Sequence, residues 1–181
     1  RYIFLVICQE EERSIKMFDV FGEFDSAEEI NEAAAAQLAE GDIEAIMTIA
    51  RENGIDADDA QDYIDGTTDE LCSPLMAAFG KIEVEAAELK PKEIIEDWVN
   101  YIKKRCTESE DMASAVRSKG KRVKGCIAML LKWSWENSYS VDKDIIHLSG
   151  IKGPSAVKMG IPGMATAYRL IDEYYLGGDK H

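Results

Sequence analysis

Residues 26–66 read SAEEINEAAAAQLAEGDIEAIMTIARENGIDADDAQDYIDG and contain the signals that decide the fold. Three helix starts and three helix ends follow one another in this stretch: Ser26, Asp42 and Asp56 as caps, and Gly41, Gly54 and Gly66 as terminators. Ser26 and Glu29 also form a capping box, which strengthens the first start. The stretch therefore predicts three short, consecutive α-helices with narrow apolar faces.

Helical periodicity continues toward the C-terminus. Ser73–Pro74 is a strong start signal for a fourth helix, because proline at the first helical position loses no hydrogen bond. Apolar stripes predict further helices over residues 94–105, 108–117, 123–134 and 164–175, while the Gly- and Pro-rich residues 150–163 predict irregular structure. Before the helices, Tyr2–Cys8 and Ile15–Phe21 are rich in β-branched and aromatic residues. We expect a mainly α protein of seven to eight helices with a small N-terminal β-hairpin.

Charge divides the chain into two halves. Residues 1–89 carry 23 acidic and 5 basic side chains, whereas residues 90–181 carry 12 acidic and 16 basic ones, so the net charge of −14 is −18 in one half and +4 in the other. Lys90–Pro91 marks this boundary. The sequence therefore predicts three regions: an N-terminal hairpin at 1–24, an acidic helical region at 25–89 and a basic helical region at 90–181.

The acidic region is dense enough to resemble a nucleic acid in charge. Residues 19–70 hold 17 carboxylates against the single base Arg51. A compact body of that length has a diameter on the order of 25 Å, and duplex DNA of the same length carries roughly 15 phosphate charges. We therefore expect this region to present a DNA-mimicking surface to a basic partner. Its residues are Asp42, Glu44, Asp56, Asp58, Asp59, Asp62, Asp65, Asp69 and Glu70.

The second half contains a basic stretch with two interpretations. No acidic residue occurs between Met112 and Trp135, while six bases do: Arg117, Lys119, Lys121, Arg122, Lys124 and Lys132. Such a stretch could hold the phosphates of duplex DNA, or it could close onto the acidic half of the same molecule. It also leaves a homodimer open, since an acidic half of one chain could pair with a basic half of another.

The sequence contains no recognisable motif for catalysis, cofactor binding or metal binding. It has no GxSxG elbow, no Walker loop and no GxGxxG. The aspartates around Asp58 fail the EF-hand pattern, because Ala60 and Gln61 stand where a ligand and a glycine are needed. We expect no enzyme activity, no cofactor and no metal site. The apolar run Tyr2–Cys8 is too short to span a membrane, which indicates a cytoplasmic protein without membrane contact.

Three stretches of the second half resemble a known family. Residues 121–133 (KRVKGCIAMLLKW), 141–144 (VDKD) and 168–175 (YRLIDEYY) look like the PcfK-like proteins of conjugative elements, whose pattern includes a Gly-Cys helix and a late Tyr-Tyr helix. Members and neighbours of that group act as anti-CRISPR proteins. The whole chain, including the acidic start and Asp42–Met47, is also similar to acidic anti-CRISPR proteins of about this length from gut Firmicutes.

This resemblance implies a function that agrees with the charge pattern. Type II RNA-guided nucleases hold guide RNA and target DNA in positively charged channels. We therefore expect an anti-CRISPR protein, that is, a CRISPR-Cas inhibitor, of a mobile genetic element or phage. It is expected to bind the guide-loaded nuclease in the bacterial host cell through its acidic surface. This binding is expected to impair target DNA binding or cleavage. The alternative is a DNA-binding accessory protein of a mobile genetic element that uses the basic stretch.

Overall fold

Nine α-helices and one two-stranded sheet make up the part of the chain that the computed structural model describes, residues 18–151 and 157–177. In chain order they are α1 (Ala27–Glu40), α2 (Ile43–Glu52), α3 (Ala57–Ile64), α4 (Pro74–Leu89), α5 (Ile94–Glu108), α6 (Glu110–Arg117), α7 (Val123–Glu136), β1 (Tyr139–Ser140), α8 (Lys143–Leu148), β2 (Lys158–Met159) and α9 (Met164–Leu176). The prediction of a mainly helical protein is confirmed, and α8 is an additional helix.

The predicted caps set the helix boundaries. The Ser26 hydroxyl accepts a hydrogen bond from the Glu29 amide at 3.2 Å, and the Glu29 carboxylate accepts one from the Asp25 amide at 2.7 Å. Gly41 ends α1 in the left-handed conformation, with φ at 75°, which a residue with a β-carbon rarely adopts. The same logic starts α4, where the Ser73 hydroxyl caps the helix and Pro74 is its first residue.

The small sheet lies in the C-terminal part of the chain, at residues 139–140 and 158–159. β1 and β2 pair antiparallel, with Tyr139 opposite Met159. Within the predicted strand Ile15–Phe21, the described residues from Phe18 onward form a turn and bends, so the prediction is wrong there. The physical reason is local: Phe18 has a φ of 58°, and the amides of Val20 and Phe21 donate to the Glu52 carboxylate at 2.9 and 3.2 Å instead of to a strand. The rest of the predicted hairpin, residues 1–17, lies outside the described residues.

Two apolar cores lie side by side, and α4 belongs to both. The first core joins α1, α2 and α3 with the loop before α4, and Ala77 of α4 packs into it. The second core joins α4 to α5, α6, α7 and α9, beginning with Ala78 and Ile82. The change from one core to the other therefore falls within α4, about one helical turn from its start, whereas the charge boundary lies beyond its C-terminal end at Lys90.

Two glycines let α2 and α4 approach each other. A β-carbon on Gly80 would lie 2.0 Å from the Asn53 carbonyl oxygen, and one on Gly54 would lie 2.4 Å from the Gly80 carbonyl oxygen. Both distances are far inside van der Waals contact. Gly54 also has a φ of +66°, so its conformation independently favours glycine.

Buried charged groups fill the junction between the two cores. Lys81, almost fully buried, pairs with Glu23 at 2.8 Å and donates to the Arg117 and Ser118 carbonyls. Arg117, equally buried, donates to the Asn53 side chain at 2.8 Å and to the Phe24 carbonyl. Because each contact joins residues far apart in the sequence, these groups fix the acidic helices against the rest of the molecule.

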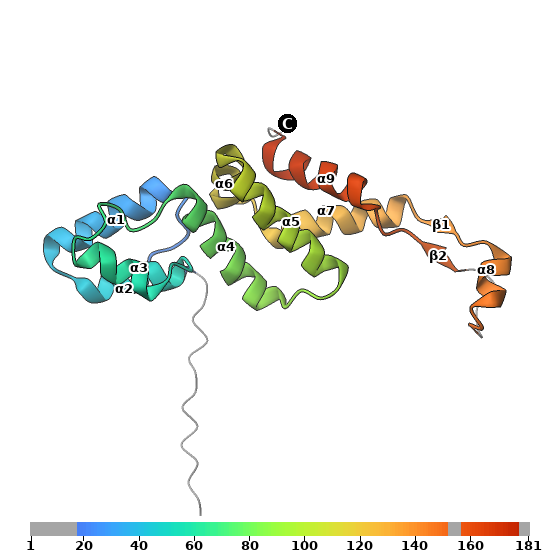
Figure 1. Cartoon of the computed structure of the whole chain (residues 1–181), viewed down its shortest axis with the longest axis horizontal. Helices are drawn as coiled ribbons and strands as arrows, with labels where there is room; N and C mark the ends of the chain where they lie inside the picture. Colours follow the sequence, from blue (N-terminus) through green and yellow to red (C-terminus); the bar gives the residue numbers. More distant parts are fainter. Residues whose placement is uncertain (1–17, 152–156, 178–181) are drawn as a thin grey trace, which may run out of the picture.

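The molecule is elongated, with three parts in a row (Figure 1). Helices α1, α2 and α3 form one end, which we call the acidic lobe, and α4–α7 with α9 form the centre. Residues 139–151 and 157–161 extend beyond α7 and α9, with β1 paired to β2 and α8 at the far end, and we call these residues the arm. None of the described helices combines the length and apolar character that a membrane crossing requires.

Candidate acidic binding surface

All nine predicted acidic residues are solvent-exposed in the acidic lobe. Some of them also shape the helices that present them. Asp42 accepts a hydrogen bond from the Ala45 amide at 2.9 Å and caps α2, and Asp56 accepts one from the Asp58 amide at 3.0 Å and caps α3. Glu44, Asp58 and Asp59 lie in first helical turns, where the helix dipole favours a negative charge. Capping thus explains why carboxylates stand at these positions.

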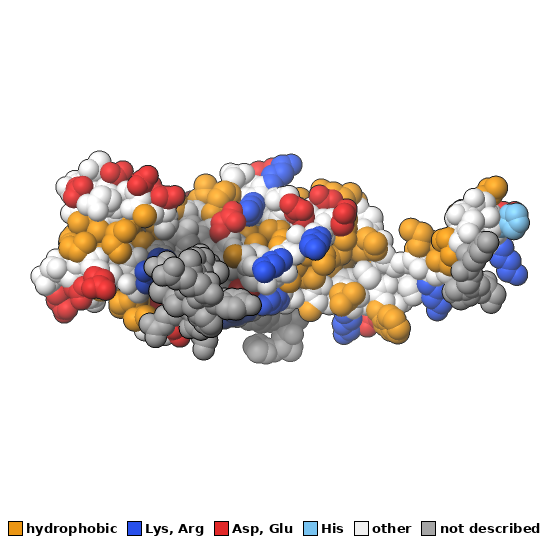
Figure 2. Space-filling view, turned by 90° about the horizontal axis from the view of Figure 1, so that it is seen from below, with side chains coloured by type: hydrophobic (Ala, Val, Ile, Leu, Met, Phe, Trp, Pro, Cys, Tyr) orange, Lys and Arg blue, Asp and Glu red, His pale blue; other side chains and the backbone are white. Residues whose placement is uncertain are grey.

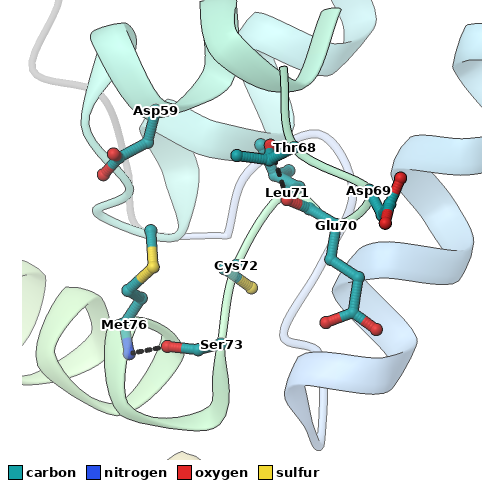
Figure 3. Close-up of a pocket in the computed structure, with 8 residues that line it drawn as sticks. All are labelled: Asp59, Thr68, Asp69, Glu70, Leu71, Cys72, Ser73 and Met76. Atoms are coloured by element: carbon teal, nitrogen blue, oxygen red, sulfur yellow. Dashed lines mark hydrogen bonds between the residues drawn. The ribbon is translucent and has the colours of Figure 1, made fainter. Parts of the chain in front are cut away.

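The loop between α3 and α4 continues the acidic surface and is held in place by α1. The Asn31 side chain donates to the Cys72 carbonyl at 2.9 Å and accepts from the Cys72 amide at 3.0 Å, as a strand partner would. This anchor presents Asp69 and Glu70, both exposed, on the outer side of the loop (Figure 3). The acidic surface therefore includes a loop with a defined conformation as well as helix starts.

A shallow cavity of about 490 Å³ lies beside this loop. Asp59 of α3 and Met76 of α4 lie on one side of it, and Asp69 and Glu70 lie on the other, where they diverge (Figure 3). Cys72 lines it as well, but burial raises the pKa of this thiol to about 12, so it is a poor nucleophile at neutral pH. The diverging carboxylates suit several separate cationic partners better than one small ligand.

The carboxylates of the acidic surface have little neutralisation from their own chain. Among the residues that the structure describes, no ion pair joins any of the nine to a base. The one base of the lobe, Arg51, is exposed and donates to the Thr48 hydroxyl at 3.4 Å. Figure 2 shows acidic side chains gathered at this end of the molecule. The surface is thus available to an external cationic group.

The six predicted basic residues are engaged within the chain, largely with carboxylates. Lys119, Arg122 and Lys124 pair with Glu29, Glu23 and Glu88 at 3.5, 2.8 and 3.0 Å, and Lys132 lies 3.9 Å from Glu136. Lys121 donates to the Tyr174 carbonyl at 3.0 Å. Arg117 is buried in the junction, and desolvation lowers its pKa.

These contacts decide where the basic residues act. Glu23 and Glu29 precede or belong to the acidic lobe, so Lys119 and Arg122 reach across the junction toward it. In the part of the chain that the structure describes, three of the six, Lys119, Arg122 and Lys124, form ion pairs with carboxylates of the acidic half. The net charge that remains exposed to a partner is therefore mainly negative.

Sequence reasoning missed the junction residues. Glu23, Glu52, Lys81 and Glu85 were not singled out, although Lys81 is the only base between Arg51 and Lys90. A lone lysine that falls on the apolar stripe of a helix, one residue before the buried Ile82, is a signal that could have indicated a buried ion pair.

Within the described residues, no group of three or more His, Cys, Asp or Glu side chains is arranged to hold a metal ion. No protein-family model, no curated protein and no solved structure matches the chain. The resemblance to PcfK-like and anti-CRISPR proteins therefore stays a prediction, and a function has to be argued from the acidic surface itself.

Proposed function

We propose that this protein is a non-enzymatic inhibitor that binds the guide-loaded type II RNA-guided nuclease through the acidic lobe and impairs target DNA binding or cleavage. One observation carries the proposal: the nine carboxylates are exposed without a described ion pair, while the six residues of the basic stretch are engaged within the chain. A protein that offers one sign of charge in this way suits a partner of the opposite sign.

The nucleic-acid channel of such a nuclease has the required chemistry. It is lined by lysines and arginines that receive phosphates of the guide–target duplex and of the displaced strand. Residues three or four positions apart on a helix, as Asp58 and Asp62 on α3 are, have β-carbons about 5–6 Å apart. Their carboxylates can therefore meet neighbouring lysines or arginines that line the channel along a phosphate path.

The rival function, duplex DNA binding by the basic stretch, is supported less well. Arg117 is buried, and Lys119, Arg122 and Lys124 would have to leave carboxylate partners before they could contact phosphate. A mobility-shift assay with duplex DNA alone separates the two functions. Binding that disappears on Lys124→Glu would favour the rival, because Lys124 is exposed and its substitution leaves the junction intact.

Pull-down of the purified nuclease, with and without guide RNA, tests the proposal directly. The variant of choice carries Asp58→Asn, Asp59→Asn, Asp62→Asn and Asp65→Asn, because amides remove charge while they preserve side-chain size. Asp56 is left unchanged as the cap of α3. We expect capture of the guide-loaded form by the wild type, capture reduced by roughly tenfold or more in the variant, and restored target binding by the nuclease.

A matched control removes charge from another helix start. Glu110→Gln with Asp111→Asn takes two exposed carboxylates from the first turn of α6, outside the acidic lobe. This control should inhibit as the wild type does. If the α3 variant inhibits fully, or if the α6 control loses as much activity, the acidic lobe is not the contact surface.

A further inference from the structure

The arm exposes large apolar side chains at its base and at its tip. Leu131 and Trp135 on α7 and Ile161 after β2 lie around its base, and Tyr139, Ile145 and Leu148 lie farther along. Trp135 and Leu148 are each 84% exposed. On the scale of roughly 150–250 Å² that applies to aromatic side chains, the six together expose at most on the order of 800 Å².

Backbone contacts nevertheless fix the orientation of the arm relative to α7. Its two strands pair for only two residues each, and the Val141 amide donates to the Val157 carbonyl at 2.8 Å where they diverge. At the base, a β-carbon on Gly160 would lie 2.1 Å from the Ser134 carbonyl oxygen, so the returning chain lies directly against the end of α7. Pro162 is buried beside it.

The arm has almost no core of its own. None of the six residues of α8 is buried, and an isolated helix of this length or an isolated two-residue hairpin is not stable in water. Its conformation therefore needs a surface to pack against. A groove with a volume of about 430 Å³ lies at the base of the arm, lined by Leu131, Trp135 and Ile161 with Lys158 at its edge.

Charge indicates what covers the arm. Residues 131–164 hold four lysines, Lys132, Lys143, Lys152 and Lys158, against the three acids Glu136, Asp142 and Asp144, so their formal charge is only +1. A nearly neutral, apolar surface gains little from the basic channel that suits the acidic lobe. It does suit a copy of itself, because Asp142 and Asp144 can face lysines of the other arm. The acidic lobe lies at the opposite end of the molecule (Figure 1), so two chains joined by their arms keep their negative lobes apart.

We propose that two copies of this chain form a dimer through their arms, related by a two-fold axis, with α8 of each copy seated in the groove at the base of the other arm. The interface is then isologous: Leu148 of each copy packs near Trp135 of the other, and both contacts form together. The summed exposed area of the six side chains is of the same order as the roughly 800 Å² that each partner buries in a standard interface. This inference does not rest on the proposed function, since it concerns the protein alone.

Sedimentation velocity of the purified protein without nuclease tests the dimer. We expect a dimer at micromolar concentration, and a dissociation constant raised by at least about tenfold for Trp135→Lys and for Leu148→Lys. Leu38→Lys in the acidic lobe is the matched control, because Leu38 is also an exposed leucine but lies far from the arm. Circular dichroism checks that each variant keeps its helices. A wild type that stays monomeric up to on the order of 100 μM, or a control that dissociates equally, overturns the proposal.

Mixing two variants tests the arrangement of the arms. In the proposed dimer, a chain with Trp135→Lys and a chain with Leu148→Glu form one lysine–glutamate contact and one native contact. The mixture should therefore form heterodimers, although each variant alone is monomeric. If mixing does not restore dimers, or if the wild type forms open-ended oligomers, the two-fold arm-to-arm geometry is wrong.

Discussion

Two glutamates at the junction, the partly buried Glu23 and the buried Glu85, have opposite electrostatic environments. Burial opposes ionisation of Glu23, but its hydrogen bond and ion pair with Lys81 and its pairing with Arg122 together lower its pKa below the ordinary value of 4.5. Burial also raises the pKa of Glu85, and for this residue the Val123 amide, which donates at 2.6 Å, and Lys81 do not compensate. The two residues should therefore affect stability with opposite dependence on pH.

Glu23→Gln is expected to destabilise the protein at neutral pH by about 3 kcal/mol, because it leaves the buried Lys81 without its carboxylate. A lowered folded-state pKa means that the stability from Glu23 is complete above 4.5 and is lost as the pH falls through the folded-state value. The difference in unfolding free energy between wild type and variant should shrink as the pH is lowered below 4.5. Urea denaturation at a series of pH values measures it.

Glu85→Gln serves as the contrasting variant. A raised folded-state pKa means that stability is complete below 4.5 and is lost as the pH rises through the folded-state value. The glutamine oxygen can still accept from Val123, so the variant should be at least as stable as the wild type at neutral pH and should lose this advantage in acid. Parallel curves for the two variants would mean that Glu23 and Glu85 are not in different environments.

Gly80→Ala should destabilise the protein by roughly 3 kcal/mol, because its β-carbon would meet the Asn53 carbonyl and force α2 and α4 apart. Gly41→Ala is the matched control. Gly41 has a positive φ but open space around its β-carbon position, so its cost should be only about 1 kcal/mol. Thermal unfolding of both variants gives the comparison, and equal losses would contradict close packing at Gly80.

Local signals predicted residues whose roles are local. Ser26, Asp42 and Asp56 cap the helices that they were expected to cap, since a cap bonds to an amide two or three residues away. Lys81 and Gly80 escaped prediction because their partners lie far along the chain: the Arg117 carbonyl for the lysine and the Asn53 carbonyl for the glycine. No short-range pattern contains that information.

The same distinction holds for whole elements. Long helices with apolar stripes, such as α5 and α9, were predicted because the stripe is the face that packs into the core. The strands β1 and β2 and helix α8 were not predicted, because they are short and have no buried face to impose a period. An element without an apolar face toward its own core gives no periodic signal, even when its exposed side is apolar.

Hydrogen exchange should reveal whether the arm depends on a second copy. The amides of Val141, Ile146 and Ser149 each donate to a backbone carbonyl within the arm. In the dimer we expect these amides to be protected, and in Trp135→Lys we expect their protection to fall by at least about tenfold, because a two-residue ladder alone does not hold them. The amides of α4 provide the internal reference. Unchanged protection in the arm of a monomeric variant would show that the arm is stable alone.

At the scale of the whole molecule, the net charge of −14 is unevenly distributed in space, which composition alone does not reveal. The basic residues of the second half offset carboxylates at the junction and beside it, as Arg122 does with Glu23 and Lys124 with Glu88. Most of the excess negative charge then remains on the acidic lobe, at one end, while the arm at the other end is close to neutral. The molecule thus has a strongly negative end and a nearly neutral end that exposes apolar side chains.

This separation predicts opposite responses of the two associations to salt. Binding of the acidic lobe to the nuclease should weaken by roughly tenfold or more between about 0.1 and 0.5 M NaCl, because the Debye length falls from about 10 Å to less than half of that. Dimerisation through the arm should hold or strengthen over the same range, because it buries apolar surface and brings two negative chains together. Titration of the guide-loaded nuclease measures the first response, and sedimentation of the free protein in the same buffers measures the second. If the affinity for the nuclease does not change with salt, the carboxylates do not carry the contact. If the dimer dissociates as the salt concentration rises, charge and not the apolar arm holds the dimer together.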